Sequence, residues 1–192
     1  MIFLYVILSG YILGSIPSAV WIGKLFHGID IREHGSKNAG ATNTFRVIGN
    51  GSGIIVLILD VLKGYIAASV PLYLSHLYIG FKDDELILQL IASFCAIIGH
   101  VFPVLANFKG GKGVATALGV FAAVSLSVAG GLALTWLVVA LVFRYSSLAA
   151  LASAASAPLW TWWLLAAPVY TGLAMLLALM LILRHRANIG RL

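Results

Sequence analysis

Long apolar segments alternate along this chain with short polar stretches. A helix of about 20 apolar residues crosses a hydrocarbon core of roughly 30 Å, and most of the apolar segments have about that length. Backbone groups in lipid must be paired internally, and no segment alternates in the way that a barrel strand does. The pattern therefore predicts an all-α bundle of membrane-spanning helices, with apolar segments at residues 2–23, 53–79, 86–106, 114–143, 148–166 and 169–183.

The fourth segment, residues 114–143, is too long for one ordinary span and is interrupted by Gly130-Gly131. If the chain turns at this glycine pair and crosses twice, every basic cluster except Lys82 falls on the inner side, as the positive-inside rule requires. The second half, Leu132–Phe143, would cover only about 18 Å, so it needs a thinned bilayer or a partly re-entrant path. We predict seven transmembrane helices in a single domain, residues 1–192, with short interfacial or re-entrant helices on the cytoplasmic side.

The composition agrees with a polytopic integral membrane protein. Hydrophobic residues make up 61% of the chain and charged residues only 9%, which is far from the composition of a soluble domain. The net charge of +6 suits an anionic lipid surface or anionic substrates. Nucleic acid is not expected as a partner, because no soluble basic domain exists to hold it. The link from Gly80 to Glu85 is net acidic and is expected on the outer side.

The first inner polar stretch, Asp30–Arg46, contains a predicted short helix with Asn38 as its N-cap and Gly49-Asn50-Gly51 as its stop signal. Thr42, Asn43 and Arg46 would share one face of this helix. Guanidinium, amide and hydroxyl donors together match phosphate oxygens. An interfacial helix with a snorkelling arginine explains the same spacing equally well.

A second inner stretch, Phe108–Gly113, combines two lysines with three glycines. Glycines let backbone N–H groups converge on an anion, and the helix predicted from Val114 adds the positive end of its dipole. The stretch is not a Walker A motif, because Ala106 occupies the first glycine position and Gly113 replaces the final Ser or Thr. It favours a phosphate site, and a flexible, positively charged turn is the alternative.

Two more polar stretches are expected on the same side. One is the corner Arg144–Ser147, which carries two serines, and the other is the C-terminal tail, which carries His185, Asn188 and three arginines. A basic end after the last span is also typical of a topology signal. These stretches therefore add hydroxyl, amide and imidazole groups to the candidate chemistry without proving a role for them.

Asp60, Lys63 and His100 fall inside the predicted spans. Asp60 and Lys63, at positions i and i+3, can neutralise each other, and an unpaired charge at membrane depth costs at least ~2.5–3.5 kcal/mol. We interpret them as a structural pair or as a device that positions a helix near the site. His100 lies at the inner end of its span, where a core histidine and a site residue are both open. The segment Gly14–Ser18 predicts a kink and a close approach of neighbouring helices.

Missing motifs narrow the chemistry. The sequence has no G-x-S-x-G elbow, no histidine followed five positions later by aspartate, and only six carboxylates. A carboxylate-bound metal site is therefore not expected, and no cofactor is expected. The remaining polar groups are arginine, lysine, asparagine, serine, threonine, histidine and glycine amides, which bind phosphate and stabilise oxyanions.

Five motifs follow one another over nearly the whole chain. They are Gly14–Ser18; Asp30–Arg32 with Gly35–Asn43 and Arg46; Gly99–Pro103 with Phe108–Thr116; Arg144–Leu148; and His185–Leu192. In these residues and in their order the sequence closely resembles the bacterial acyl-phosphate-dependent glycerol-3-phosphate acyltransferase family.

The resemblance implies transfer of a fatty acyl group from acyl-phosphate to the 1-hydroxyl of sn-glycerol 3-phosphate. The products would be lysophosphatidic acid and phosphate, in the first step of phospholipid biosynthesis. It implies a multi-pass enzyme of the bacterial inner membrane with its site on the cytoplasmic face, using neither acyl-CoA nor a metal. A phosphate acyltransferase would act before it and supply acyl-phosphate, and the sequence leaves monomer and oligomer open.

The polar inventory and the resemblance together give a candidate site. We expect Gly110–Gly113 to cradle one phosphate, the first inner stretch to form the facing wall, and the tail to close the site. Catalytic roles are assigned to Lys112, Arg46, His185 and Asn188. The predicted substrate-binding residues are Ser36, Asn38, Thr42, Asn43, Lys109, Gly110, Gly111, Gly113, Ser146, Ser147 and His100.

Two kinds of group could accept the proton of the attacking hydroxyl: a histidine, His185 or His100, or an oxygen of the acyl-phosphate itself. We favour the substrate oxygen, because no carboxylate is expected in position to orient a histidine. A transporter for a small phosphorylated anion is the main rival from another class. It would line a path through the membrane with polar groups, whereas here they concentrate on one side. A scaffold protein explains the spans but leaves the basic, glycine-rich loops unexplained.

Overall fold

The computed structural model describes residues 1–77 and 84–190, and these residues are predominantly helical. The acidic link lies mostly outside the described residues, as does Arg191 of the tail. The chain divides into two compact units, residues 1–120 and 121–192, and each is considered by itself. The expected all-helical architecture is confirmed.

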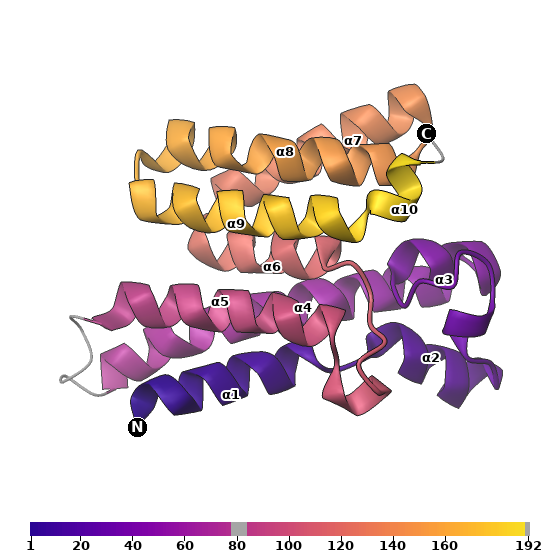
Figure 1. The fold of residues 1–192 in the computed structure, drawn as a ribbon, viewed down its shortest axis with the longest axis horizontal. Helices are drawn as coiled ribbons and strands as arrows, with labels where there is room; N and C mark the ends of the chain where they lie inside the picture. The colour runs from indigo at the N-terminus through magenta and orange to yellow at the C-terminus, as the bar shows by residue number, and fades with distance from the viewer. Residues whose placement is uncertain (78–83, 191–192) are drawn as a thin grey trace. The chain divides into compact units, whose positions relative to one another are not determined.

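In the first unit, α1, α4 and α5 pack side by side (Figure 1). Helix α1 contacts α5, and α4 contacts both, while the short α2 and α3 pack on the start of α4. Buried side chains such as Val6, Leu88 and Ala92 fill the space between α1 and α5. The elements of this unit are α1 (Ile2–Gly14), α2 (Ser18–His27), η1 (Ile31–Glu33), α3 (Ala41–Val47), α4 (Asn50–Leu77), α5 (Glu85–Val101), η3 (Val104–Ala106) and most of α6 (Val114–Val124).

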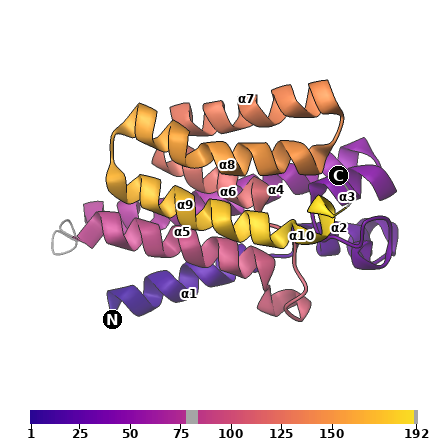
Figure 2. The same ribbon diagram turned by 45° about the horizontal axis from the view of Figure 1, so that its top comes forward.

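In the second unit, α7 (Leu126–Phe143), α8 (Ser146–Leu165) and α9 (Pro168–Arg184) form an antiparallel hairpin series, followed by the single turn α10 (Arg186–Ile189) (Figure 2). Both connections are two residues long. Arg144 and Ala166 begin them in the left-handed region, with φ of 59° and 48°. Because the connections are tight, the start of α8 and the end of α9 lie at the same end of this unit.

The first apolar segment is broken at Ser15-Ile16-Pro17, between α1 and α2. Just before the break, Gly14 packs directly on α5, since a Cβ added there would overlap the backbone of Ala96. Gly64 on α4 does the same against the carbonyl of Thr116 on α6. The predicted kink and close approach are therefore both found. Small residues let helix backbones approach in a membrane, where packing replaces the hydrophobic effect as the driving force for helix association.

The predicted turn at Gly130-Gly131 is wrong, because both glycines lie inside α7. The break falls instead at Ser125, which is extended (φ −163°) and whose side chain accepts a hydrogen bond from the Val128 N–H at 3.4 Å. A serine that caps the following helix is a stronger boundary signal than a glycine pair, which a helix can absorb. The shorter piece is consequently α6, about 16 Å long, rather than the second half.

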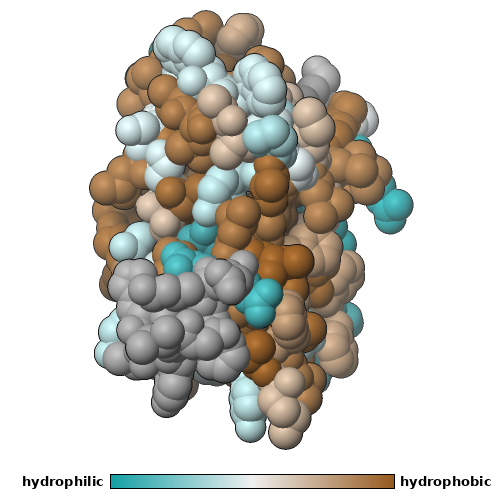
Figure 3. Space-filling view, turned by 90° about the vertical axis from the view of Figure 1, so that its left-hand side faces the viewer, coloured by the Kyte–Doolittle hydropathy of each residue, from teal (hydrophilic) through white to brown (hydrophobic). Residues whose placement is uncertain are grey.

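Five helical segments are long and apolar enough to cross a membrane: residues 2–27, 50–74, 85–106, 126–143 and 146–165. Two shorter apolar helices, α6 and α9, complete the apolar segments of the described chain, and the count of seven spans stays a prediction. Large hydrophobic side chains such as Ile58, Leu141 and Leu159 are exposed. In Figure 3, hydrophobic and weakly polar side chains cover most of the face in view.

The adjacent glycines of α7 provide a test of the continuous helix. A Cβ on Gly131 would lie 2.6 Å from the indole of Trp160, whereas a Cβ on Gly130 meets nothing within 4 Å. The Trp160 indole is held in place because its Nε1–H donates to Thr135 Oγ1 at 3.1 Å. We expect Gly131→Ala to destabilise the protein by about 1–3 kcal/mol through overpacking. Gly130→Ala should be neutral or stabilising by up to about 1 kcal/mol.

Thermal unfolding of the two purified variants in the same detergent measures this difference. If the chain turned at the glycine pair, Gly130→Ala would destabilise at least as much as Gly131→Ala, and that result would contradict the structure.

Candidate active site

Asn43 organises the first polar segment from the inside. Its side chain is 1% exposed; its amide nitrogen donates to the carbonyls of Ile31 and His34, each at 3.0 Å, and its oxygen accepts from the Ser36 N–H at 2.8 Å. A buried asparagine with its amide committed to three backbone groups shapes the loop around it. A role of Asn43 in substrate binding stays a prediction.

Helix α3 differs from the prediction at its start. Its N-cap is Gly40, in an extended conformation, and Asn38 lies two residues outside. The stop at Gly49 is confirmed, with a φ of 125°, although Asn50 already begins α4. Thr42 and Arg46, four residues apart on α3, are exposed, as is Ser36 in the loop. The hydroxyl and guanidinium donors thus remain accessible.

Arg32 joins the two polar segments of the first unit. Its Nε and Nη2 donate to the carboxylate of Asp30, at 2.9 and 2.6 Å, and its Nη1 donates to the Ala106 carbonyl at 2.8 Å. Lys24 adds a second cation 3.2 Å from Asp30. The Arg32 hydrogen bonds, more than the burial of the carboxyl, hold the pKa of Asp30 far below its usual range. This role of Asp30 and Arg32 was not predicted from the sequence, although the Asp-x-Arg spacing at the start of a loop could have suggested it.

The glycine–lysine loop, residues 108–113, is closed onto the end of α5. The N–H of Gly110 donates to the Val101 carbonyl and the N–H of Gly111 donates to the His100 carbonyl, each at 3.2 Å. These two amides do not converge on an anion as we predicted, because they satisfy carbonyls that the end of a helix leaves unpaired. Lys109 is exposed and Lys112 partly so, and α6 begins one residue after Gly113.

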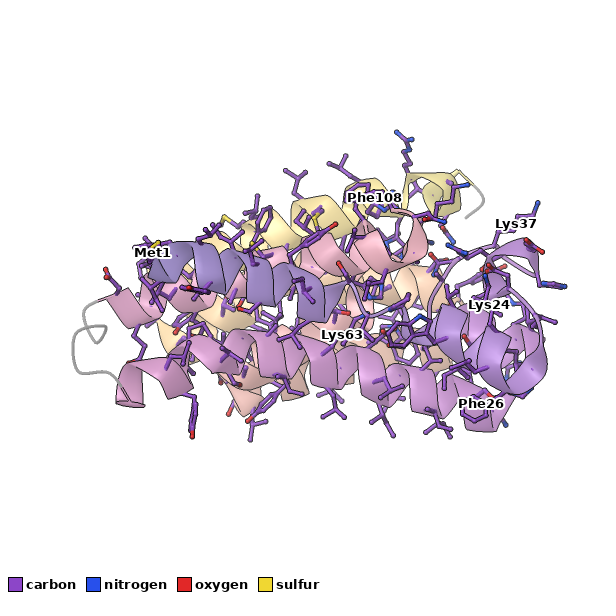
Figure 4. All side chains as sticks on the ribbon, turned by 90° about the horizontal axis from the view of Figure 1, so that it is seen from below. Met1, Lys24, Phe26, Lys37, Lys63 and Phe108 are labelled. Atoms are coloured by element: carbon purple, nitrogen blue, oxygen red, sulfur yellow. The ribbon has the colours of Figure 1, made fainter. Side chains whose placement is uncertain are left out.

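The two loops meet at Gly111. A Cβ on Gly111 would lie 2.7 Å from the carbonyl oxygen of Ala39 and would overlap the imidazole of His100. Only a residue without a side chain fits between these groups. Lys24 and Lys37 of the first polar segment lie at the end of the unit opposite Met1 (Figure 4), so the basic groups gather where the loops are.

His100 is a core histidine. It is 6% exposed, and its Nδ1 lies 3.0 Å from Thr116 Oγ1 and 3.7 Å from a carboxylate oxygen of Asp60. The expectation that no carboxylate stands beside a histidine is therefore wrong for this residue. With Gly111 packed over its ring, His100 is poorly placed to take a proton from a substrate.

The second unit places four predicted site residues at one end. Ser146 and Ser147 form the first turn of α8, and His185 and Asn188 follow α9. His185 is 3% exposed, and its Nδ1 lies 2.8 Å from the Leu181 carbonyl. A carbonyl can only accept, so Nδ1 carries the hydrogen and the neutral ring has its lone pair on Nε2. Within the described part of the chain, no group of three His, Cys, Asp or Glu side chains could hold a metal.

The fold and these polar ends define a class: a helical integral membrane protein with basic, hydroxyl and amide groups suited to phosphate. The sequence model of the glycerol-3-phosphate acyltransferase family matches residues 4–192. Proteins named glycerol-3-phosphate acyltransferase from Fusobacterium nucleatum and Vibrio campbellii are 42% and 44% identical to this chain, over 99% and 96% of it and over 93% and 86% of their own lengths. The chain belongs to the glycerol-3-phosphate acyltransferase family.

Two solved structures are similar over 98% of this chain and 90% of theirs, at 39% identity. Both are crystal structures of PlsY (YgiH), an integral membrane glycerol 3-phosphate acyltransferase. One is the glycerol 3-phosphate form, with a TM-score of 0.88, and the other is the lysophosphatidic acid form, with a TM-score of 0.85.

The lowered pKa of Asp30 predicts an acid dependence of stability. The unfolded chain takes up the proton near the ordinary carboxyl pKa of about 3.9, whereas the folded chain resists it, so stability rises with pH in this range. The ion pair therefore contributes fully above about pH 5, and its contribution is lost as the pH falls below about 4. The difference in unfolding free energy between the wild type and Asp30→Asn should therefore shrink as the pH falls from about 5 to below about 4.

Denaturant unfolding of both proteins in detergent at a series of pH values measures this difference. Asp83→Asn removes another carboxylate of the chain and is the control. A difference between wild type and Asp30→Asn that stays constant from pH 7 to pH 3 would show that the Asp30 carboxylate gains nothing from Arg32.

Proposed function

We propose that this protein transfers a fatty acyl group from acyl-phosphate to the 1-hydroxyl of sn-glycerol 3-phosphate, giving lysophosphatidic acid and inorganic phosphate. The observation that carries the proposal is the likeness to PlsY over 98% of this chain, in one form with glycerol 3-phosphate and in another with lysophosphatidic acid. These are an acyl acceptor and its acylated product, and the reaction is the first step of phospholipid biosynthesis.

The chemistry needs no covalent enzyme intermediate. Acyl-phosphate is a mixed anhydride with a good leaving group, so the hydroxyl oxygen of glycerol 3-phosphate can attack the acyl carbon directly. The ester C–O bond forms as the bond from the acyl carbon to the phosphate oxygen breaks, and phosphate leaves with the electron pair. The protein must hold two anions that repel each other and stabilise the developing oxyanion.

The accessible cations of the first unit suit that task. Arg46 and Lys109 are exposed, Lys112 is partly exposed, and Thr42 and Ser36 add hydroxyl donors. Arg46 offers a fork of N–H groups that matches phosphate, and Lys112 acts as a compact charge. The roles of His185, Asn188, Ser146 and Ser147, which belong to the second unit, stay predictions. Asn43 and His100 act through the loops that they support.

The hydroxyl proton goes to an oxygen of the acyl-phosphate in this proposal. His100 is covered by Gly111, and His185 is only 3% exposed, so neither ring is open to a substrate hydroxyl. A leaving phosphate gains basicity as the bond breaks, so it can accept the proton where it is released.

We place the reaction on the cytoplasmic face of the bacterial inner membrane, which the positive-inside distribution of basic loops supports. The acyl chain would lie along apolar helices and enter from the bilayer. Since acyl-phosphate is reactive, a phosphate acyltransferase that makes it would act immediately before this enzyme.

An assay that compares two acyl donors tests the proposed function. Purified protein is incubated with glycerol 3-phosphate and either acyl-phosphate or acyl-CoA, while phosphate release and lipid product are followed. We expect one phosphate per lysophosphatidic acid with acyl-phosphate and no product with acyl-CoA. No product from acyl-phosphate would refute the proposal, and equal use of acyl-CoA would refute the donor.

Removing the phosphate-binding charges tests the assignment of residues. Lys112→Ala and Arg46→Ala should each lower kcat/KM by about 30- to 150-fold, equivalent to about 2–3 kcal/mol of lost interaction with phosphate charge. Lys37→Gln, which removes an exposed lysine from the same polar segment, is the matched control and should stay within about threefold of the wild type. Steady-state kinetics with both substrates varied measures these effects. A similar loss of kcat/KM in all three variants would show that the overall positive charge matters and would contradict specific contacts of Lys112 and Arg46 with phosphate.

A further inference from the structure

A buried ion pair fixes the middle of the first unit. Asp60 and Lys63 on α4 are 2% and 5% exposed, and the Lys63 ammonium lies 2.9 Å from the Asp60 carboxylate. Lys63 also donates to the Ile16 carbonyl at 2.7 Å, and Ser18 Oγ donates to Asp60 at 3.0 Å. The pair therefore binds both sides of the break between α1 and α2, and Figure 4 shows Lys63 among the helices, away from the end with Lys24 and Lys37.

The Asp60 carboxylate also lies close to His100, the residue on which the glycine–lysine loop packs. Asp60 Oδ1 lies 3.7 Å from His100 Nδ1 on α5, and that nitrogen lies 3.0 Å from Thr116 Oγ1 on α6. Asp60 thus stands beside His100, which in turn contacts Thr116. Residues of four helices, α2, α4, α5 and α6, are linked through Asp60 and His100.

The loop depends on His100 at two points. The Gly111 N–H donates to the His100 carbonyl at 3.2 Å, and Gly111 has no room for a Cβ over the imidazole. Lys112 follows Gly111 directly and lies four residues before Thr116 in the sequence. A rotation of the imidazole or a shift of the start of α6 would move the backbone that carries Lys112.

We propose that Asp60 and Thr116 are positioning residues, which act through His100 to set the place of Lys112. The inference rests on the proposed function, because its effect is on the binding of a phosphorylated substrate at Lys112. Thr116 is completely buried, and Asp60 and Lys63 are nearly so, so none of the three is available to touch a substrate.

The competing explanation for these contacts is that Asp60 and Lys63 only neutralise each other's buried charge and have no effect on the loop. Removing one partner leaves an uncompensated buried charge, which is strongly destabilising, whereas removing both restores the charge balance. The double variant Asp60→Asn with Lys63→Met should therefore recover most of the melting temperature that either single substitution loses. If the carboxylate also positions His100, the double variant should keep a defect in substrate binding.

The experiment measures melting temperature and, separately, kcat and KM for acyl-phosphate and glycerol 3-phosphate. In the double variant we expect a melting temperature near that of the wild type and a KM at least tenfold higher for one of the two substrates. Thr116→Val, which replaces the hydroxyl by a methyl group of similar size, should show the same selective rise in KM. Thr116→Ser should restore the wild-type value.

Ser93→Ala is the matched control, because it removes a buried hydroxyl from α5 that has no hydrogen-bond partner within the described chain, and it should change neither KM. Wild-type KM values in both Thr116→Val and the double variant would overturn the inference. If the double variant fails to fold, Thr116→Val against Thr116→Ser decides. A wild-type protein that makes no product from acyl-phosphate would instead refute the proposed function.

Discussion

The ion pair of Asp60 and Lys63 is the constraint on which the first unit depends. Two charges inside a helix that faces lipid are tolerated only when they neutralise each other and their remaining hydrogen-bonding capacity is used. The Ile16 carbonyl and the Ser18 hydroxyl are available for this only because α1 ends at Gly14 and α2 begins at Ser18. The helix break and the buried charges thus require each other.

Glycines set the distances at which this arrangement works. Gly14 brings α1 onto α5, and Gly64 brings α4 onto α6 so closely that a Cβ would overlap a backbone group in each case. With a larger residue at position 64, Thr116 would be pushed away from α4, and with it the hydroxyl that contacts His100 beside Asp60. Packing and electrostatics are therefore coupled through small residues rather than additive.

The sequence predicted the helices well where the apolar pattern decides, and less well where one side chain decides. The hydrophobic runs located α4, α5, α8 and α9 to within a few residues, because lipid exposure forces a continuous apolar face. The break in residues 114–143 was misplaced, because the chain leaves the helix at Ser125, whose side chain caps the next helix, and not at the two glycines. One of these glycines, Gly131, packs against the Trp160 indole inside α7. The burial of Asn43 was missed because helical spacing does not reveal which side of α3 is covered by the preceding loop.

The polar residues of the first unit divide into two groups by how their hydrogen bonds are used. One group makes its polar contacts within the protein, and these contacts stabilise the loops. Its members are Asn43, Asp30, Arg32 and His100. Arg46, Thr42 and Lys109 stand exposed on the surface that those loops create. Positioning two repelling anions requires rigid backbone beneath mobile cationic side chains, because flexible support would let the phosphates separate. A membrane protein with few charges achieves this by committing some of them, such as Arg32, Asp60 and Lys63, to contacts within the protein.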